Sequence, residues 1–260
     1  MAAYLHDIWR CRYFWLSLVQ LDLRTRYRGS GLGVGWSLLR PLLMSAILCA
    51  VFHKLFEVDI RVYGPYLLIG FAGWNFLSSV TLDGCASFVQ ADAYIRQHRA
   101  PLAIYPLRTA LGAAIHLLLA LLIVLILMVG LHGIRPIPAM MVFAPGLGLL
   151  FLFGWAVATV AALVNVHFRD TQHLCDVGLQ MLFYLTPVIY PAEILQQRGM
   201  GWLVQYNPLA CFLELLRTPL IECRPPSSSA FGVAAIAVAI AGAAAILMLS
   251  RLQRRLVFYL

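Results

Sequence analysis

Charged residues are scarce in this sequence. They make up 12% of its 260 residues, whereas 62% of the residues are hydrophobic. A typical soluble domain is about 25% charged and about 45–50% apolar. The shortage of charge excludes a sizeable soluble domain and predicts an all-α integral membrane protein, built as one membrane domain over residues 1–260.

Lysine is nearly absent: Lys54 is the only one, and no GxxxxGK[ST] motif occurs. That motif supplies the phosphate-binding loop and the lysine of P-loop ATPases, so the chain has no ATP site of this kind. Gly31, Gly33 and Gly35 resemble part of a dinucleotide fingerprint, but no strand precedes them and they lead into an apolar segment. We expect no cofactor in this chain.

The six cysteines form no CxxC pair, which argues against a metal or redox role, although Cys211 and Cys223 could pair in an oxidising compartment. We expect no cleavable signal peptide, because the first 20 residues contain charges and lack a continuous apolar core. Four potential metal ligands cluster without HExxH spacing: His167, Asp170, His173 and Asp176. We interpret this cluster as a polar turn at the membrane surface and not as a metal site.

The segment 21–43 changes from strongly basic to apolar. Arg24, Arg26 and Arg28 precede a glycine-rich stretch, and the apolar run begins at Trp36. An arginine at the bilayer centre costs roughly 2.5–3.5 kcal/mol on insertion scales, so these side chains belong at an interface. Basic residues favour the cytoplasmic side, which orients the first span.

Residues 4–28 are predicted to form an amphipathic helix on the membrane surface. Trp9, Trp15 and Leu23 spread over the side opposite a polar stripe, as in interfacial helices. The stripe consists of His6, Arg10, Ser17, Gln20, Arg24 and Arg28. Packing of this helix against the protein's own spans is the alternative, and the two arrangements are compatible.

Six apolar segments follow, each near the roughly 20 residues that a bilayer requires. They cover residues 36–56, 66–89, 107–131, 139–166, 174–189 and 231–249. An even number of spans places both termini on one side. Thirteen basic residues lie on that side and six on the other, which predicts cytoplasmic termini. The positive charge then faces anionic lipid, and no nucleic acid is needed to explain it.

Two connecting segments are long enough to carry structure of their own. Residues 90–101 begin a charged cytoplasmic loop and are predicted to form a short helix that Pro101 ends. The external segment 190–225 is apolar in parts but is interrupted by proline and glycine. We therefore expect short re-entrant helices there that dip into the outer leaflet.

Few polar residues fall within the predicted spans. Asp83 is the clearest, and we expect it to pair with a juxtamembrane arginine such as Arg40 or Arg108. We interpret His116 as a neutral histidine bonded to a neighbouring helix. A proton-coupled pump would carry more buried ionisable groups than this.

Aromatic residues lie near the ends of spans or beside polar residues. Such rings either anchor the protein at the membrane interface or line a pathway along which an uncharged, sugar-like chain could slide. The candidate pathway residues are Trp74, Asn75, Phe76, Tyr184 and Tyr190.

Six short motifs occur in order along nearly the whole chain. They are RYRGSGLGVGW (26–36), RPLL (40–43), GWNF (73–76), FRD (168–170), TPVIYP (186–191) and NPL (207–209), the last followed by Arg217. With these motifs the chain resembles the permease subunits of type-2 ABC exporters of cell-surface polysaccharides, the class that moves O-antigen, capsule and teichoic-acid chains. Each motif is short, but their order and spacing together are specific.

The resemblance implies a homodimer in the bacterial inner membrane that works with two copies of a separate ATPase subunit, where ATP and Mg bind. The helix at 90–101 would be a coupling helix that docks into the ATPase, and the aromatic residues would line a channel for a lipid-linked glycan. The expected ATPase contacts are Arg24, Arg28, Asp92, Tyr94, Arg96, His98 and Arg99. The expected structural polar residues are Arg40, Asp83, Arg169 and Asp170.

These features favour a polysaccharide-export permease that is a transport subunit and not an enzyme. Without a P-loop the driving force has to come from a partner, and six spans are too few to enclose a wide channel without dimerisation. One alternative is a permease for a drug or a simple lipid. Another is an intramembrane glycosyl- or acyltransferase, which would need convergent acids or a nucleophile that the sequence does not show.

Overall fold

The computed structural model describes residues 2–31, 33–97, 100–133 and 136–252, and these residues form helices without any strand. The predicted all-α class is confirmed. Four of these helices are long and apolar enough to cross a membrane. They are α3 (Gly35–Phe52), α6 (Ile104–His132), α7 (Pro136–His167) and α12 (Ser228–Leu252). They correspond to the first, third, fourth and sixth predicted spans.

The second and fifth predicted spans correspond to helices of a different character. α4 (Ile60–Gln90) has 31 residues and is about 45 Å long, but Asn75, Asp83 and several hydroxyl residues make it less apolar. α8 (Thr171–Leu185) has 15 residues, about 22 Å, which is less than the roughly 30 Å of a hydrocarbon core. Length and composition therefore identify four spans within the described residues.

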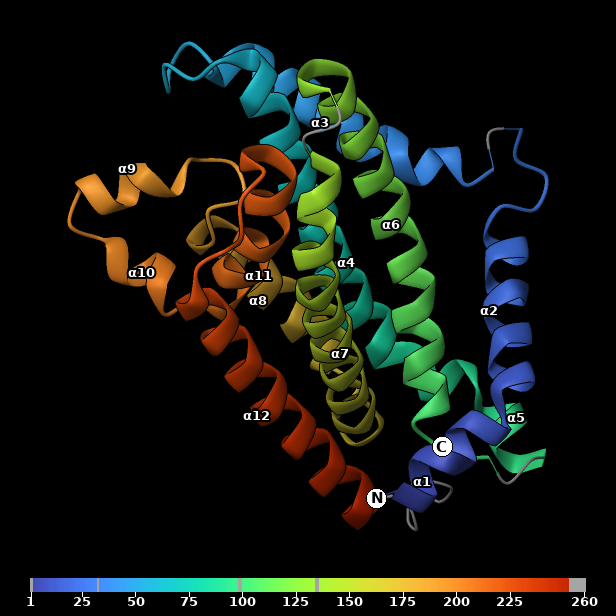
Figure 1. The fold of residues 1–260 in the computed structure, drawn as a ribbon. Coiled ribbons are helices and arrows are strands. Elements are labelled where there is room, and N and C mark those ends of the chain that lie inside the picture. Colours follow the sequence, from blue (N-terminus) through green and yellow to red (C-terminus); the bar gives the residue numbers. More distant parts are fainter. Residues whose placement is uncertain (1, 32, 98–99, 134–135, 253–260) are drawn as a thin grey trace.

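α4 lies at the centre of the bundle and packs against α6 and α7 (Figure 1). Close approach between α4 and α7 depends on glycine. A Cβ on Gly84 would lie 2.8 Å from the Ala158 Cα atom, and a Cβ on Gly154 would lie 2.7 Å from the Phe76 ring. Small residues bring helix backbones together where no water drives their association. α12 packs along α7.

The amino-terminal segment forms two helices, α1 (Ala2–Arg10) and α2 (Arg12–Arg26), where one helix over 4–28 was expected. The break is at Cys11, and the Trp15 indole N–H donates to the Ile8 carbonyl at 3.2 Å, next to the break. This bond supplies a donor to a carbonyl at the end of α1. α2 packs against α6, with Leu18 buried, so the helix does contact the protein's own bundle.

The two ends of the bundle differ. α1, α5 (Asp92–Gln97) and the C-terminal end of α12 gather at one end, which we call the inner end (Figure 1). α5 falls within the predicted helix at 90–101, of which residues 98 and 99 lie outside the described residues. The opposite, outer end contains the start of α4 and residues 186–191, which are joined by hydrogen bonds.

The segment 190–225 contains three short α-helices followed by a π-helical turn. They are α9 (Ala192–Gln197), α10 (Gly201–Gln205), α11 (Pro208–Arg217) and η1 (Thr218–Glu222). Asn207 caps α11, because its side-chain oxygen accepts from the Leu209 N–H at 2.9 Å. α11 enters the core, where the Phe212 ring lies 4.9 Å from that of Phe153 on α7, whereas α9 and α10 extend to one side (Figure 1).

Candidate functional site

A groove of about 410 Å³ lies between α3, α4 and α8, and we call it the central groove. Helical periodicity explains why these residues share one surface. α4 contributes positions 71, 74, 75, 78 and 82, and α8 contributes positions 176, 179, 180, 183 and 184. Spacings of three and four residues place side chains on one face of a helix, so two such faces meet here, with Arg40, Pro41 and Met44 of α3 beside them.

One wall of the central groove is aromatic. The rings of Trp74 and Phe183 pack edge to face with centroids 5.4 Å apart, and the rings of Phe71 and Phe183 stack at 6.1 Å. Tyr184 adds a ring that is 67% exposed. The first three rings hold α4 against α8, whereas Tyr184 presents most of its surface to the groove side or to the surroundings.

Four exposed polar side chains of the central groove, in addition to Ser78 and Tyr184, have no hydrogen-bond or ion-pair partner within the described part of the chain. This group consists of Arg40, Asn75, Asp176 and Gln180. Each of them has donors or acceptors that a bound molecule can use. Aromatic side chains beside amide, carboxylate and guanidinium groups suit a ligand that is rich in hydroxyls and also has apolar faces.

Of the five predicted pathway residues, the structure brings three together in the groove: Trp74, Asn75 and Tyr184. Phe76 lies elsewhere, 2% exposed in the core against Gly154. Tyr190 follows α8, and its hydroxyl donates to the Tyr184 carbonyl at 3.0 Å. Burial raises the pKa of the Tyr190 hydroxyl, which keeps it protonated as a donor. A role in transport stays a prediction for all five.

Sequence reasoning predicted only Tyr184 on the α8 side of the groove and missed the rest of that side. Asp176 was considered only as a metal ligand, and Gln180 and Phe183 were not singled out. The signal was present as a repeat of three and four residues between positions 176 and 184, on a helix too short to look like an ordinary span.

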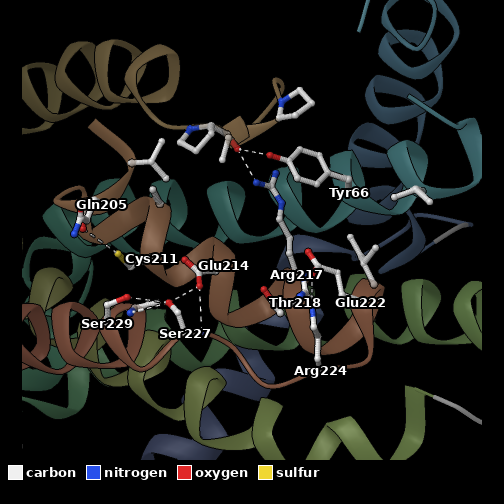
Figure 2. Close-up of a pocket in the computed structure, with 18 of the residues that line it drawn as sticks. Tyr66, Gln205, Cys211, Glu214, Arg217, Thr218, Glu222, Arg224, Ser227 and Ser229 are labelled. Atoms are coloured by element: carbon white, nitrogen blue, oxygen red, sulfur yellow. Dashed lines mark hydrogen bonds and ion pairs between the residues drawn. The ribbon is translucent and has the colours of Figure 1, made fainter. Parts of the chain in front are cut away.

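A second and larger cavity, of about 860 Å³, lies at the outer end, and we call it the outer cavity (Figure 2). Arg217 stands at its edge and is 7% exposed. Its guanidinium donates to the Pro187 carbonyl at 2.6 Å and to the Val188 carbonyl at 2.8 Å. The same group lies 3.5 Å from the centroid of the Tyr66 ring, within range of a cation–π interaction.

Tyrosines add to this arrangement of Arg217 with residues 186–191, which we call the outer clasp. The Tyr63 hydroxyl donates to the Ile189 carbonyl at 2.9 Å, and the Tyr66 hydroxyl donates to the Tyr190 carbonyl at 3.0 Å. Gly70 leaves room for the arginine, because a Cβ there would overlap its Nη2 atom and lie 2.8 Å from the Val188 carbonyl oxygen. The clasp therefore ties the end of α8 to α4 and α11.

At the inner end, no residue of α5 is buried, so the predicted ATPase contacts on this helix are at least partly exposed. Asp92 and Arg96 form an ion pair at 2.7 Å, and the Tyr94 ring packs edge-on to Phe14 of α2 at 6.2 Å. Arg24 and Arg28 are exposed at the end of α2 and just beyond it, and this end of α2 points away from α5 (Figure 1). His98 and Arg99 lie outside the described residues.

The loop that follows α5 is fixed to α1 and α7. The Ala103 N–H donates to the Tyr4 hydroxyl at 3.2 Å, and the Trp155 indole N–H donates to the Ala103 carbonyl at 3.1 Å. Burial raises the pKa of the Tyr4 hydroxyl, so it remains neutral as an acceptor. The α5 region is thus bonded to both the amino-terminal helices and the bundle.

Asp83 pairs with a juxtamembrane arginine, as expected, but the two arginines named as examples, Arg40 and Arg108, are not its partners. Its carboxylate lies 3.7 Å from Arg26, whereas Arg108 pairs with Asp22 through two hydrogen bonds and Arg40 faces the central groove. Both pairs join α2 to the bundle, because Asp22 faces α6 and Arg26 faces α4. His116 contacts the Tyr27 hydroxyl at 3.4 Å, as a bonded histidine should.

The remaining polar candidates form no evident site. Arg169 and Asp170 are exposed in the turn before α8, and Asp170 makes no side-chain cap to that helix. Cys211 and Cys223 are free thiols. Among the residues that the structure describes, no group of three His, Cys, Asp or Glu side chains is arranged to hold a metal.

Comparison with known proteins identifies relatives of this sequence. The profile of the family described as ABC-2 type transporter matches residues 13–221. The chain is 27% identical over 195 residues to an O-antigen export system permease protein RfbA of Klebsiella pneumoniae, covering 74% of each chain. It is 25% identical over 253 residues to the protein of the same name from Myxococcus xanthus, covering 96% of this chain and 97% of that one.

Proposed function

This chain belongs to the ABC-2 type transporter family, and we propose that it is the permease subunit of an ATP-driven exporter of a lipid-linked polysaccharide. Membership makes it a transport subunit and sets aside the intramembrane transferase. The observation that supports a glycan cargo is the central groove, with its aromatic wall and its four unpartnered polar side chains. Sugar rings offer apolar faces to aromatic side chains and hydroxyls to polar ones.

The permease is a homodimer in this proposal. α8 has no buried residue, and its apolar side chains Leu174, Val177 and Met181 are 72%, 53% and 63% exposed. Exposed apolar side chains on a helix with polar residues suit a protein partner better than lipid alone. A second copy over α3 and α8 would cover this surface and close the central groove into a path.

α4 and α8 are the second and fifth of six spans in this proposal. Residues 186–189 lengthen α8 toward the outer end, and α11 fills the space beyond them as a re-entrant helix. The ends of α8, which is shorter than the hydrocarbon core, are then covered by protein and not by lipid. Both termini and α5 lie on the cytoplasmic side of the bacterial inner membrane, as the distribution of basic residues predicts.

The driving force comes from two copies of an ABC ATPase, which bind ATP and Mg and contact α5 and, in the amino-terminal segment, Arg24 and Arg28. Movement of α5 is passed to α2 through the Tyr94–Phe14 contact. It then reaches α6 through the Asp22–Arg108 pair and α4 through the Arg26–Asp83 pair. A shift of α4 relative to α8 changes the width of the central groove.

The test is a deletion strain complemented with variants of the central groove. Asn75→Leu and Tyr184→Ala are expected to lower surface polysaccharide while the protein accumulates in the membrane normally, because both side chains are exposed and make no side-chain hydrogen bond in the described chain. Ile240→Ala, on the exposed face of α12, is the matched control. Intact surface polysaccharide in the deletion strain would favour a drug or lipid cargo instead.

A further inference from the structure

We propose that the outer cavity is a second binding site for the exported chain, one that holds uncharged saccharide units near the outer end of the path. This inference rests on the proposed function, since it names a further contact for the same cargo. At about 860 Å³ the cavity has room for a short oligosaccharide, because ligand pockets span roughly 300–1,000 Å³. The argument depends on its charge, its unused polar atoms and its rigidity.

The charged groups of the outer cavity balance. Glu214 and Glu222 oppose Arg217 and Arg224, and Glu222 is paired with Arg224 (Figure 2). A site for a phosphate group would carry an excess of basic side chains, and a site for a divalent cation would gather carboxylates without arginine. A balanced and strongly polar lining fits a neutral ligand with many hydroxyls.

Several polar atoms in the cavity are unused. Glu214 Oε1 accepts from the Ser227 N–H at 3.2 Å and from the Ser227 hydroxyl at 2.6 Å, but Glu214 Oε2 has no partner in the described chain. The same holds for the side-chain amide of Gln205 and the hydroxyl of Thr218. Together they present acceptors and donors from α10, α11 and η1, which are the complements of sugar hydroxyls.

Two walls of the cavity are held by hydrogen bonds. The outer clasp holds residues 186–191 against α4, and the Glu214–Ser227 bonds join α11 to the residue before α12. Thr218 begins η1, a π-helical turn, and such turns occur often at functional sites. A cavity with fixed walls loses little entropy when it binds a ligand.

Photo-crosslinking in cells that make their own surface polysaccharide tests the proposal. A benzoyl-phenylalanine is introduced in place of Gln205 in the outer cavity, Asn75 in the central groove, or Ile240 on the exposed face of α12. After irradiation, the permease is purified and probed with antiserum against the polysaccharide. We expect a glycan adduct at positions 205 and 75 and none at position 240.

The outcomes separate the two proposals. An adduct at position 75 without one at position 205 overturns this inference and leaves the proposed function standing. No adduct at either position overturns both. A protein or a phospholipid without glycan, captured at position 205, shows that another occupant fills the cavity and also overturns the inference.

Variants of the unused atoms give a second readout in the same cells. Thr218→Val removes one hydroxyl, and Glu214→Gln keeps an oxygen for Ser227 while it replaces Oε2. Each is expected to lower the adduct yield at position 205 about threefold to tenfold, the loss of one hydrogen bond. Ser250→Ala, at the inner end of α12, is expected to leave the yield unchanged. Unchanged yields in both cavity variants, with folded protein, would contradict the proposal.

Discussion

Arg217 and Arg40 both lie in an apolar chain, yet the surroundings of their guanidinium groups are opposite. Arg217 is 7% exposed and contacts two carbonyls and a tyrosine ring in the outer clasp. Arg40 is exposed in the central groove, without a partner in the described chain. Removing a charge from water is costly unless protein groups replace the water. The outer clasp replaces the water around Arg217 and gives this residue a structural role. The donors of Arg40 remain available to a bound molecule.

The largest effect on stability is expected at Arg217. Arg217→Leu leaves the Pro187 and Val188 carbonyls without this donor, and a buried group that loses its partner costs about 1–3 kcal/mol. We expect the free energy of unfolding, measured by SDS titration in mixed micelles, to fall by about 2–4 kcal/mol. Arg224→Leu is the control, since that side chain is exposed. Equal stability of Arg217→Leu and the unchanged protein would show that the clasp is not structural.

Gly70 tests the same contact from the other side. In Gly70→Ala the added methyl group overlaps Arg217 Nη2 and the Val188 carbonyl, so overpacking should cost about 1–3 kcal/mol in the same titration. Gly112→Ala on α6 is the matched control, because no atom lies within 4 Å of the added Cβ. There the helix gains from the better propensity of alanine. A similar loss in both variants would rule out a specific clash.

The Arg26–Asp83 pair lies between the two extremes. Both side chains are about half exposed, and the atoms are 3.7 Å apart. Such pairs contribute about 0.2–1 kcal/mol, so Asp83→Asn should lower stability by no more than that. In the proposed mechanism, Asp83→Asn should nevertheless lower ATP-driven export of polysaccharide. A double-mutant cycle with Arg26→Gln isolates the coupling, and full additivity would contradict a working ion pair.

Arg40→Gln is expected to have the smallest effect on stability, within about 0.5 kcal/mol, because no contact in the described chain is lost. Its effect should be on transport, since the central groove loses the only arginine among its described lining residues. Surface polysaccharide and unfolding are measured on the same variant. A loss of stability like that of Arg217→Leu would remove the distinction between the two arginines.

The long apolar segments could be predicted from the sequence because each one is long and apolar enough by itself to cross a membrane. The runs at 107–131 and 231–249 need no knowledge of their neighbours, and both appear as α6 and α12. The partner of Asp83 could not be predicted in this way. It depends on how α2 runs along α6, which is set by packing between residues far apart in sequence.

The wrong placement of Phe76 has a different cause, because the helical period of the sequence does separate Phe76 from the groove face. Trp74 and Asn75 share a helical face with Ser78, whereas Phe76 lies about 100° further around the helix from Asn75 and about 200° from Trp74. Applying the helical period within the GWNF motif would have placed Phe76 in the core. Tyr190 lies beyond the end of α8 at Leu185, so no period could relate it to Tyr184.

The outer clasp has a consequence for the direction of movement. α8 is anchored by Arg217 and two tyrosines just beyond its last residue, while its first residue follows an exposed turn. A helix that is anchored at one end can be displaced most at its other end. In the proposed mechanism, the separation of α4 and α8 is therefore expected to be larger at the end where α5 lies than at the outer end.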